Sequence, residues 1–401
     1  MTININKYLK KTTIIGFFTL YPGFALYNTL VAYNLFPPLL GGFFGMFSII
    51  YLFFLLPGLI LTNKKISYNQ TPYVVLIISF FLLTLLIVVT NILLSFSQEV
   101  LLGSKQTIES LILLFTALLM GYYIEISKKT YRILVCIILA TFLLLILFII
   151  TNNSLFFYAK KIADDNVSWA VSTYQGYARS AMMVSIMAIS VPKKIKSYLL
   201  ITIMSLFILF ILGSRTELVG FFFASFLLLF IKFKKKGLKL FLFSFVLLLP
   251  ILLVLYELII SYGINSRIFE LFNLSNSTSW LARQKLQEIG IAQIIESPIT
   301  GEFAGHIITT GTAGGYIHNI LSAWAGFGVF VFTIYALSII IPLLTCLKLI
   351  IKGNSSNKVN LCFAYSSMIL LFSLFSDPIY SFLPGFSWGM YLSILKGNNE
   401  K

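Results

Sequence analysis

Residues 73–97 read YVVLIISFFLLTLLIVVTNILLSFS and contain no charged side chain. A helix needs about 20 mostly apolar residues to cross a bilayer, so this stretch predicts one transmembrane helix. We expect an all-α polytopic membrane protein with about 12 spans, because a helix satisfies its own backbone polar groups in lipid. The predicted spans lie near 12–33, 39–62, 73–97, 108–126, 133–151, 174–191, 197–214, 216–233, 240–260, 318–347, 361–377 and 379–395.

The composition supports the same class of protein. The chain has 401 residues, of which 59% are hydrophobic and only 10% are charged, whereas soluble proteins carry about 25% charged residues. We therefore expect a single integral membrane domain over residues 1–401. The net charge of +16 is explained by lysines in the turns between spans. Because the chain also lacks a nucleic-acid-binding motif, nucleic acid is excluded as a partner.

The positions of the positive charges predict the orientation. If the N-terminus is cytosolic and the spans alternate, most of the 29 Lys and Arg residues fall on the cytosolic side. Both termini are then cytosolic, and residues 261–317 form a large outer loop between the ninth and tenth predicted spans. The positive residues left on the outer side are Lys105, Lys160, Lys161, Arg179, Arg215, Arg267, Arg283 and Lys285.

The outer loop contains a predicted helix over about 280–297, because apolar residues recur there at helical spacing. Ser297-Pro298 ends it, since the residue before a proline disfavours the helical conformation. Arg283 and its glutamine neighbours lie off the apolar stripe. We expect an amphipathic helix that lies on the outer membrane surface. The stripe consists of Leu286, Ile289, Ala292 and Ile295.

Arg179, Arg215, Arg267 and Arg283 lie on the outer side, against the usual topological preference. An anionic partner would explain them, because a guanidinium donates bidentate hydrogen bonds to phosphate. For Arg215, the alternatives are an interfacial position and a pair with Glu217. For Arg283, the alternative is contact with lipid head groups. Arg179 lies within a predicted span, where burial requires a charge partner.

We predict different surroundings for the two histidines, His306 and His318. His318 begins a span beside Gly314-Gly315, close to the arginines, where an imidazole can hold or move a proton near neutral pH. A purely hydrogen-bonding role is the alternative. His306 lies in a glycine-rich loop, and we expect it to be exposed to solvent. The acidic residue Asp377 lies on the outer side without an evident partner.

No pattern in the sequence predicts a metal site. Asp164-Asp165 lacks further ligands at a suitable spacing, so we expect a solvated loop there. The cysteines fall in or at the ends of apolar runs and lack the C-x-x-C spacing, and we expect small buried side chains. They are Cys136, Cys346 and Cys362.

Several motifs together resemble the O-antigen ligase and O-antigen polymerase superfamily. The resemblance covers about residues 212–330, and it depends on the order of the motifs, because each is weakly specific alone. The motifs are Ser214-Arg215, Ala282-Arg283, Ser297-Pro298-Ile299-Thr300-Gly301, Gly314-Gly315-Tyr316-Ile317-His318-Asn319 and Gly326-Phe327-Gly328.

The resemblance implies a glycosyltransferase of the bacterial cytoplasmic membrane that works on its outer face without a metal or other cofactor. The donor and acceptor would be glycans on undecaprenyl pyrophosphate. Arg215 and Arg283 would bind the pyrophosphate and stabilise it as a leaving group. His318 would orient or deprotonate the acceptor hydroxyl. Arg179 and Arg267 would be further phosphate ligands.

The compact outer loop and the motif around His318 favour a polymerase, which joins repeat units into O-antigen or capsular polysaccharide. The partners would be membrane lipids, a chain-length regulator and a flippase. One alternative is an O-antigen ligase, which transfers finished glycan to lipid A-core. A flippase for lipid-linked oligosaccharide is the alternative outside the enzymes. We would expect a flippase to have two related halves around a central cavity, but here the charged features concentrate in one outer segment.

Overall fold

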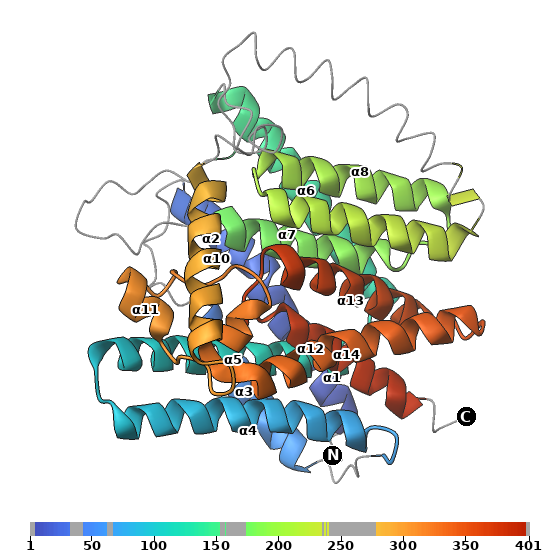
Figure 1. Ribbon diagram of the computed structural model, residues 1–401. Coiled ribbons are helices and arrows are strands. Elements are labelled where there is room, and N and C mark those ends of the chain that lie inside the picture. The colour runs from blue at the N-terminus through green and yellow to red at the C-terminus, as the bar shows by residue number, and fades with distance from the viewer. Residues whose placement is uncertain are drawn as a thin grey trace.

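The computed structural model is an assembly of helices (Figure 1). It describes residues 5–32, 43–61, 67–152, 157, 174–234, 236–237, 239 and 278–397, and within these ranges it contains no strand. The helices are α1 (Ile5–Leu20), α2 (Pro22–Ala32), α3 (Phe43–Leu61), α4 (Thr71–Leu94), α5 (Gln98–Tyr123), α6 (Lys128–Asn152), α7 (Tyr174–Ile189), α8 (Ile195–Ile211), a helix over Arg215–Lys234, α10 (Thr278–Glu296), α11 (Gly305–Thr310), α12 (Leu321–Ile351), α13 (Asn357–Phe375) and α14 (Leu383–Gly397).

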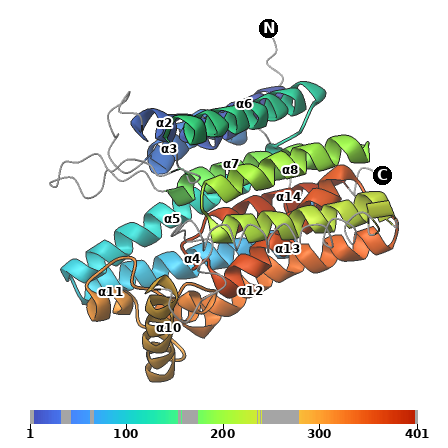
Figure 2. The ribbon, with the colours of Figure 1, turned by 90° about the horizontal axis from the view of Figure 1, so that it is seen from above.

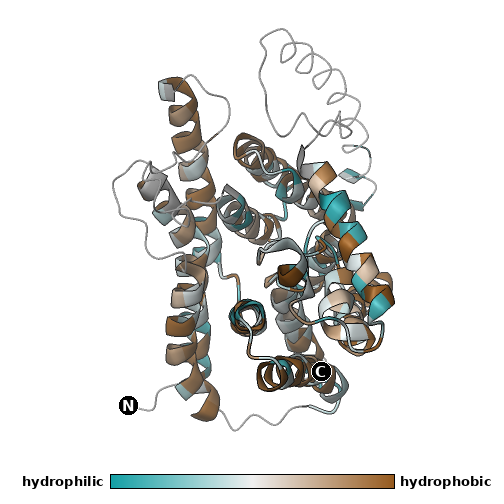
Figure 3. Ribbon diagram, turned by 60° about the vertical axis from the view of Figure 1, so that its left-hand side comes forward, coloured by the Kyte–Doolittle hydropathy of each residue, from teal (hydrophilic) through white to brown (hydrophobic). Residues whose placement is uncertain are grey.

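Among the described residues, 7 helices are long and apolar enough to cross a membrane. Figure 3 shows the long helices coloured mostly as hydrophobic. The chain is therefore an all-α membrane protein, as its composition predicts. These helices are α3, α4, α5, most of α6, Arg215–Lys234, α12 and α13.

The expected number of spans, about 12, is matched only in part. The predicted span 12–33 is divided, because α1 ends at Leu20 and α2 begins at Pro22. A proline is tolerated in the first turn of a helix but not in its interior. The predicted span 379–395 corresponds to α14, which has only 15 residues. The predicted span 240–260 lies outside the described residues.

Glycines bring α5 and α14 into close contact. A Cβ atom on Gly385 or Gly389 of α14 would collide with the carbonyl oxygen of Leu114 or Leu118, respectively, in α5. Gly121 of α5 is packed in the same way against Phe386. Small residues at membrane helix interfaces permit such close approach of two backbones.

The turn after α10 is fixed on a kink in α12. Gly328 interrupts α12 with φ 79° and ψ 174°, and the turn passes so closely that a Cβ atom on Gly301 would lie 2.7 Å from the Phe327 nitrogen. The Glu302 amide donates to the Ala325 carbonyl at 2.7 Å, and the Trp324 indole donates to the Pro298 carbonyl at 2.8 Å. Figures 1 and 2 show α10 running across the direction of the long helices.

Candidate functional site

A cavity of about 520 Å³ opens where α7, α10, α13 and the start of helix Arg215–Lys234 meet. The segment before α12 and the loop between α13 and α14 complete its wall. Cavities of this size accommodate a small ligand or the head group of a larger one. The lining residues are Gln175, Arg179, Gly213, Ser214, Arg215, Thr216, Glu217, Val219, Trp280, Arg283, Tyr316, His318, Leu371, Phe372, Phe375, Ser376, Asp377, Pro378, Tyr380 and Ser381.

The cavity brings together most of the residues that the sequence analysis selected. Arg179, Arg215, Arg283 and His318 all line it, although they come from four separate segments of the chain. Arg267 lies outside the described residues. The cavity wall thus contains three arginines and one imidazole, together with the carboxylates of Glu217 and Asp377.

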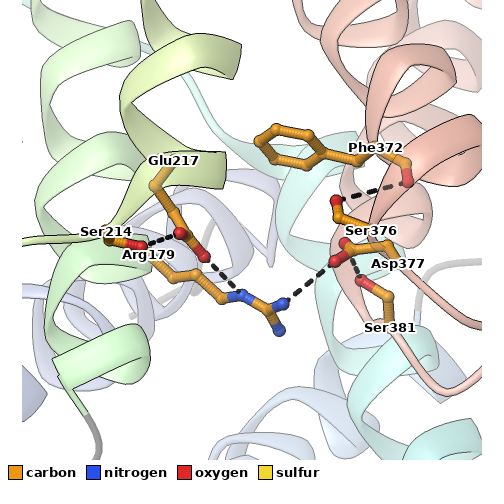
Figure 4. Close-up of polar contacts among 7 residues, drawn as sticks. All are labelled: Arg179, Ser214, Glu217, Phe372, Ser376, Asp377 and Ser381. Carbon is orange, nitrogen blue, oxygen red and sulfur yellow. Dashed lines mark hydrogen bonds and ion pairs between the residues drawn. The ribbon is translucent and has the colours of Figure 1, made fainter. Parts of the chain in front are cut away.

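Arg179 has the charge partners that its position in a predicted span requires. Its Nε donates to Oε1 of Glu217 at 3.0 Å, and its Nη2 donates to Oδ1 of Asp377 at 3.0 Å. Figure 4 shows the guanidinium between the two carboxylates. Glu217 belongs to helix Arg215–Lys234, and Asp377 belongs to the loop between α13 and α14. Asp377, which had no evident partner in the sequence, thus pairs with an arginine far away in the chain.

The two carboxylates of this cluster have a partner on each of their oxygens. The Ser214 hydroxyl donates to Oε2 of Glu217, and the Ser381 hydroxyl donates to Oδ2 of Asp377 at 2.7 Å. Both carboxylates are buried. Ser214 and Glu217 have the S-x-x-E spacing of a helix capping box, which signals the start of a helix at Arg215. The spacing predicts only where the helix starts, and it gives no signal for the ion pair of Glu217 with Arg179.

His318 precedes α12 and lies in the cavity wall as a half-buried side chain. Its ring centre is 5.1 Å from that of Tyr316. Burial is the main cause that lowers the pKa of His318 from 6.5 to about 4, and the positive charge of Arg283 adds to this effect, while Asp377 opposes it. His318 is therefore neutral near pH 7, and it can accept a hydrogen bond from a hydroxyl group.

The prediction for His306 was wrong. The residue is buried, with 6% of its surface exposed, and its ring centre lies 5.7 Å from that of Tyr316 and 6.0 Å from that of Tyr380. The glycine-rich segment forms the short helix α11. The start of α11 packs on α5, because a Cβ atom on Gly103 of α5 would lie 3.0 Å from the Cβ atom of Ala304. Here the small residues permit close packing and do not mark a solvated loop.

Helix α10 carries Arg283 and packs on the segment that carries His318. Gly290 is buried, and a Cβ atom there would collide with the side chain of Ile317. Residues seven positions apart lie on the same face of a helix, so Arg283 and Gly290 face the same way. Ile295 of the predicted apolar stripe is 73% exposed, while Gln293 is buried, so the stripe is not the face that packs inward.

Trp280 and Tyr316 also line the cavity, although neither was predicted as a site residue and Tyr316 appeared only within a motif. Within the part of the chain that the structure describes, no three His, Cys, Asp or Glu residues gather as metal ligands would. Cys346 and Cys362 are buried as predicted, but Cys136 is exposed. It lies on α6, and the prediction of a buried Cys136 was wrong.

Comparison of the chain with protein-family models and with curated proteins found no match.

Proposed function

We propose that this protein is a metal-independent glycosyltransferase that polymerises oligosaccharide repeat units carried on undecaprenyl pyrophosphate. In this proposal it lies in the bacterial cytoplasmic membrane, with about 12 spans and both termini in the cytosol. The reaction takes place at the outer face. The product is O-antigen or capsular polysaccharide.

The observation that supports the proposal is the meeting of Arg215, Arg283 and His318 in one cavity. These residues carry the resemblance to the O-antigen superfamily, and they lie far apart in the sequence. A pyrophosphate needs several cationic donors, and two arginines can bind it in a bidentate way. Aromatic side chains in the same wall, among them Trp280 and Tyr316, offer apolar faces on which a sugar ring can stack.

In the proposed reaction, a hydroxyl oxygen of the acceptor glycan attacks the anomeric carbon of the donor glycan. The new carbon–oxygen bond forms as the bond between that carbon and the pyrophosphate oxygen breaks. Undecaprenyl pyrophosphate leaves with the electron pair of the broken bond. Arg215 and Arg283 lower the barrier because they stabilise the negative charge that develops on the leaving oxygen.

The proton of the attacking hydroxyl needs an acceptor. His318, whose pKa is lowered to about 4 by burial, is a weaker base than a terminal phosphate, whose second pKa is about 6. His318 therefore accepts a hydrogen bond from the hydroxyl and orients it. The proton ends on the released pyrophosphate, and charge and atoms balance.

The surface polysaccharide of a deletion strain tests the proposal. The gene is removed and restored as the natural chain, as Arg283→Ala or as His318→Ala, and the polysaccharide is separated on a gel. A band of core plus one repeat unit, with the long ladder absent in the deletion and in both variants, supports a polymerase. Bare core with long glycan left on the lipid carrier would identify a ligase. Repeat units retained on the cytosolic leaflet would identify a flippase and refute the enzymatic proposal.

A further inference from the structure

The ion-pair cluster formed by Arg179, Glu217 and Asp377 connects three separate parts of the cavity wall. Arg179 belongs to α7, Glu217 to the first turn of helix Arg215–Lys234, and Asp377 to the loop between α13 and α14. All three residues line the cavity. Glu217 follows Arg215 by two residues, so the cluster lies beside the helix turn that carries Arg215.

The charge of the cluster does not favour an anion. Two carboxylates surround one guanidinium, and both carboxylates are almost fully buried, with side-chain exposures of 2% for Glu217 and 4% for Asp377. A buried charge is weakly screened, so the net negative charge of the cluster repels a nearby phosphate. Arg179 is thus different from Arg215 and Arg283, although all three are arginines of one cavity.

The hydrogen bonds of Glu217 and Asp377 use both oxygens of each carboxylate. Each carboxylate oxygen already accepts from Arg179 or from a serine hydroxyl. Removing one member of such a buried group leaves the others without a counter-charge. The side chains in the cluster are therefore mutually dependent, and they are already paired without any ligand.

We infer that Arg179 is a positioning residue, which holds three parts of the cavity wall through Glu217 and Asp377 and does not bind the pyrophosphate. The inference rests on the proposed function for the identity of the anion. It replaces the expectation that Arg179 is a further phosphate ligand.

The test compares variants that change the charge of the cluster with variants that keep it. Arg179→Gln makes the cluster more negative, while Arg179→Gln combined with Asp377→Asn keeps the net charge of the natural chain. The combination of Arg179→Gln with Glu217→Gln is a second charge-matched pair, for use if the first does not fold. Arg215→Gln serves as the reference for a true ligand. Each full-length protein is purified in detergent, its folding is checked by gel filtration, and its affinity for inorganic pyrophosphate is measured by calorimetry.

We expect Arg179→Gln alone to weaken pyrophosphate binding about tenfold through repulsion, and the charge-matched pair to restore the affinity to within about threefold of the natural chain. The turnover of lipid-linked repeat units by the pair should stay about tenfold or more below normal, because the wall is no longer held. An affinity of the pair as low as that of Arg215→Gln would overturn the inference, as would a pair with normal affinity and normal turnover. If Arg215→Gln itself binds pyrophosphate normally, the proposed function fails instead.

Discussion

At the scale of single residues, Arg283 is the side chain on which the proposed chemistry depends most directly. It lies in the cavity wall and acts on His318 through its charge. We expect Arg283→Ala to lower the rate of undecaprenyl pyrophosphate release about 100-fold, since removal of one charge-assisted donor to a leaving group has effects of this order. The measurement is the initial rate with purified protein and lipid-linked repeat units.

Lys285 provides the matched control for Arg283. It lies two residues further along α10 and is exposed, so Lys285→Ala removes a positive charge from the same helix without changing the cavity wall. We expect its rate to stay within about twofold of normal, because exposed charges are screened by salt. Equal losses in the two variants would mean that the general charge of α10, and not a contact with the substrate, supports the reaction.

The two histidines make stability depend on pH. Burial lowers the pKa of both His306 and His318 from 6.5 to about 4. Between these values the unfolded chain binds more protons than the folded chain, so the stability is fully present above about pH 6.5 and declines as the pH falls toward 4. The melting temperature of a protein with His306→Gln and His318→Gln should fall less between pH 7 and pH 4 than that of the natural chain. Parallel melting curves for the two proteins would contradict this.

At the scale of elements, the turn after α10 depends on Gly301. This residue has φ 68°, and a Cβ atom there would collide with the backbone of Gly328. Gly311 has nearly the same φ, 72°, but has no atom within 4 Å of the added Cβ. We expect Gly311→Ala to reduce stability by about 1 kcal/mol through backbone strain alone. Gly301→Ala should reduce it by about 2 kcal/mol more, because the turn must also move away from α12.

Thermal unfolding of both glycine variants in the same detergent measures this difference. Gly301→Ala should also reduce turnover, because the turn connects the helix of Arg283 to the helix that follows His318. Similar melting temperatures for the two variants would show that the close backbone contact contributes little to the fold.

The helices themselves could largely be predicted from the sequence, but their packing could not. A run such as residues 73–97 predicts a helix because its apolar length leaves no other structure in lipid. The buried face of α10 was not predictable, because it depends on Gly290, a residue without a side chain that fits against Ile317. Hydrophobic periodicity detects only faces that carry apolar side chains.

At the scale of the whole molecule, the sequence pointed to several residues of the cavity wall but not to the contacts that support that wall. Arg179, Arg215 and Arg283, which oppose the topological preference, line one cavity, while the binding of an anion there stays a prediction. The pairing of Arg179 with Asp377 joins two distant segments, and one sequence contains no signal for such a contact. The burial of His306 likewise follows from the packing of α11 on α5, which local composition does not predict.

Polymerisation of a lipid-linked glycan would be an activity of the whole molecule in its membrane. The most direct test places the purified protein in liposomes with a fluorescent repeat unit on undecaprenyl pyrophosphate, and separates the products by size. We predict a ladder with the spacing of one repeat unit, one undecaprenyl pyrophosphate released for each new bond, and no ladder with Arg283→Ala. Transfer of unchanged repeat units across the bilayer, without a ladder and without release of the carrier, would contradict the proposed polymerase activity.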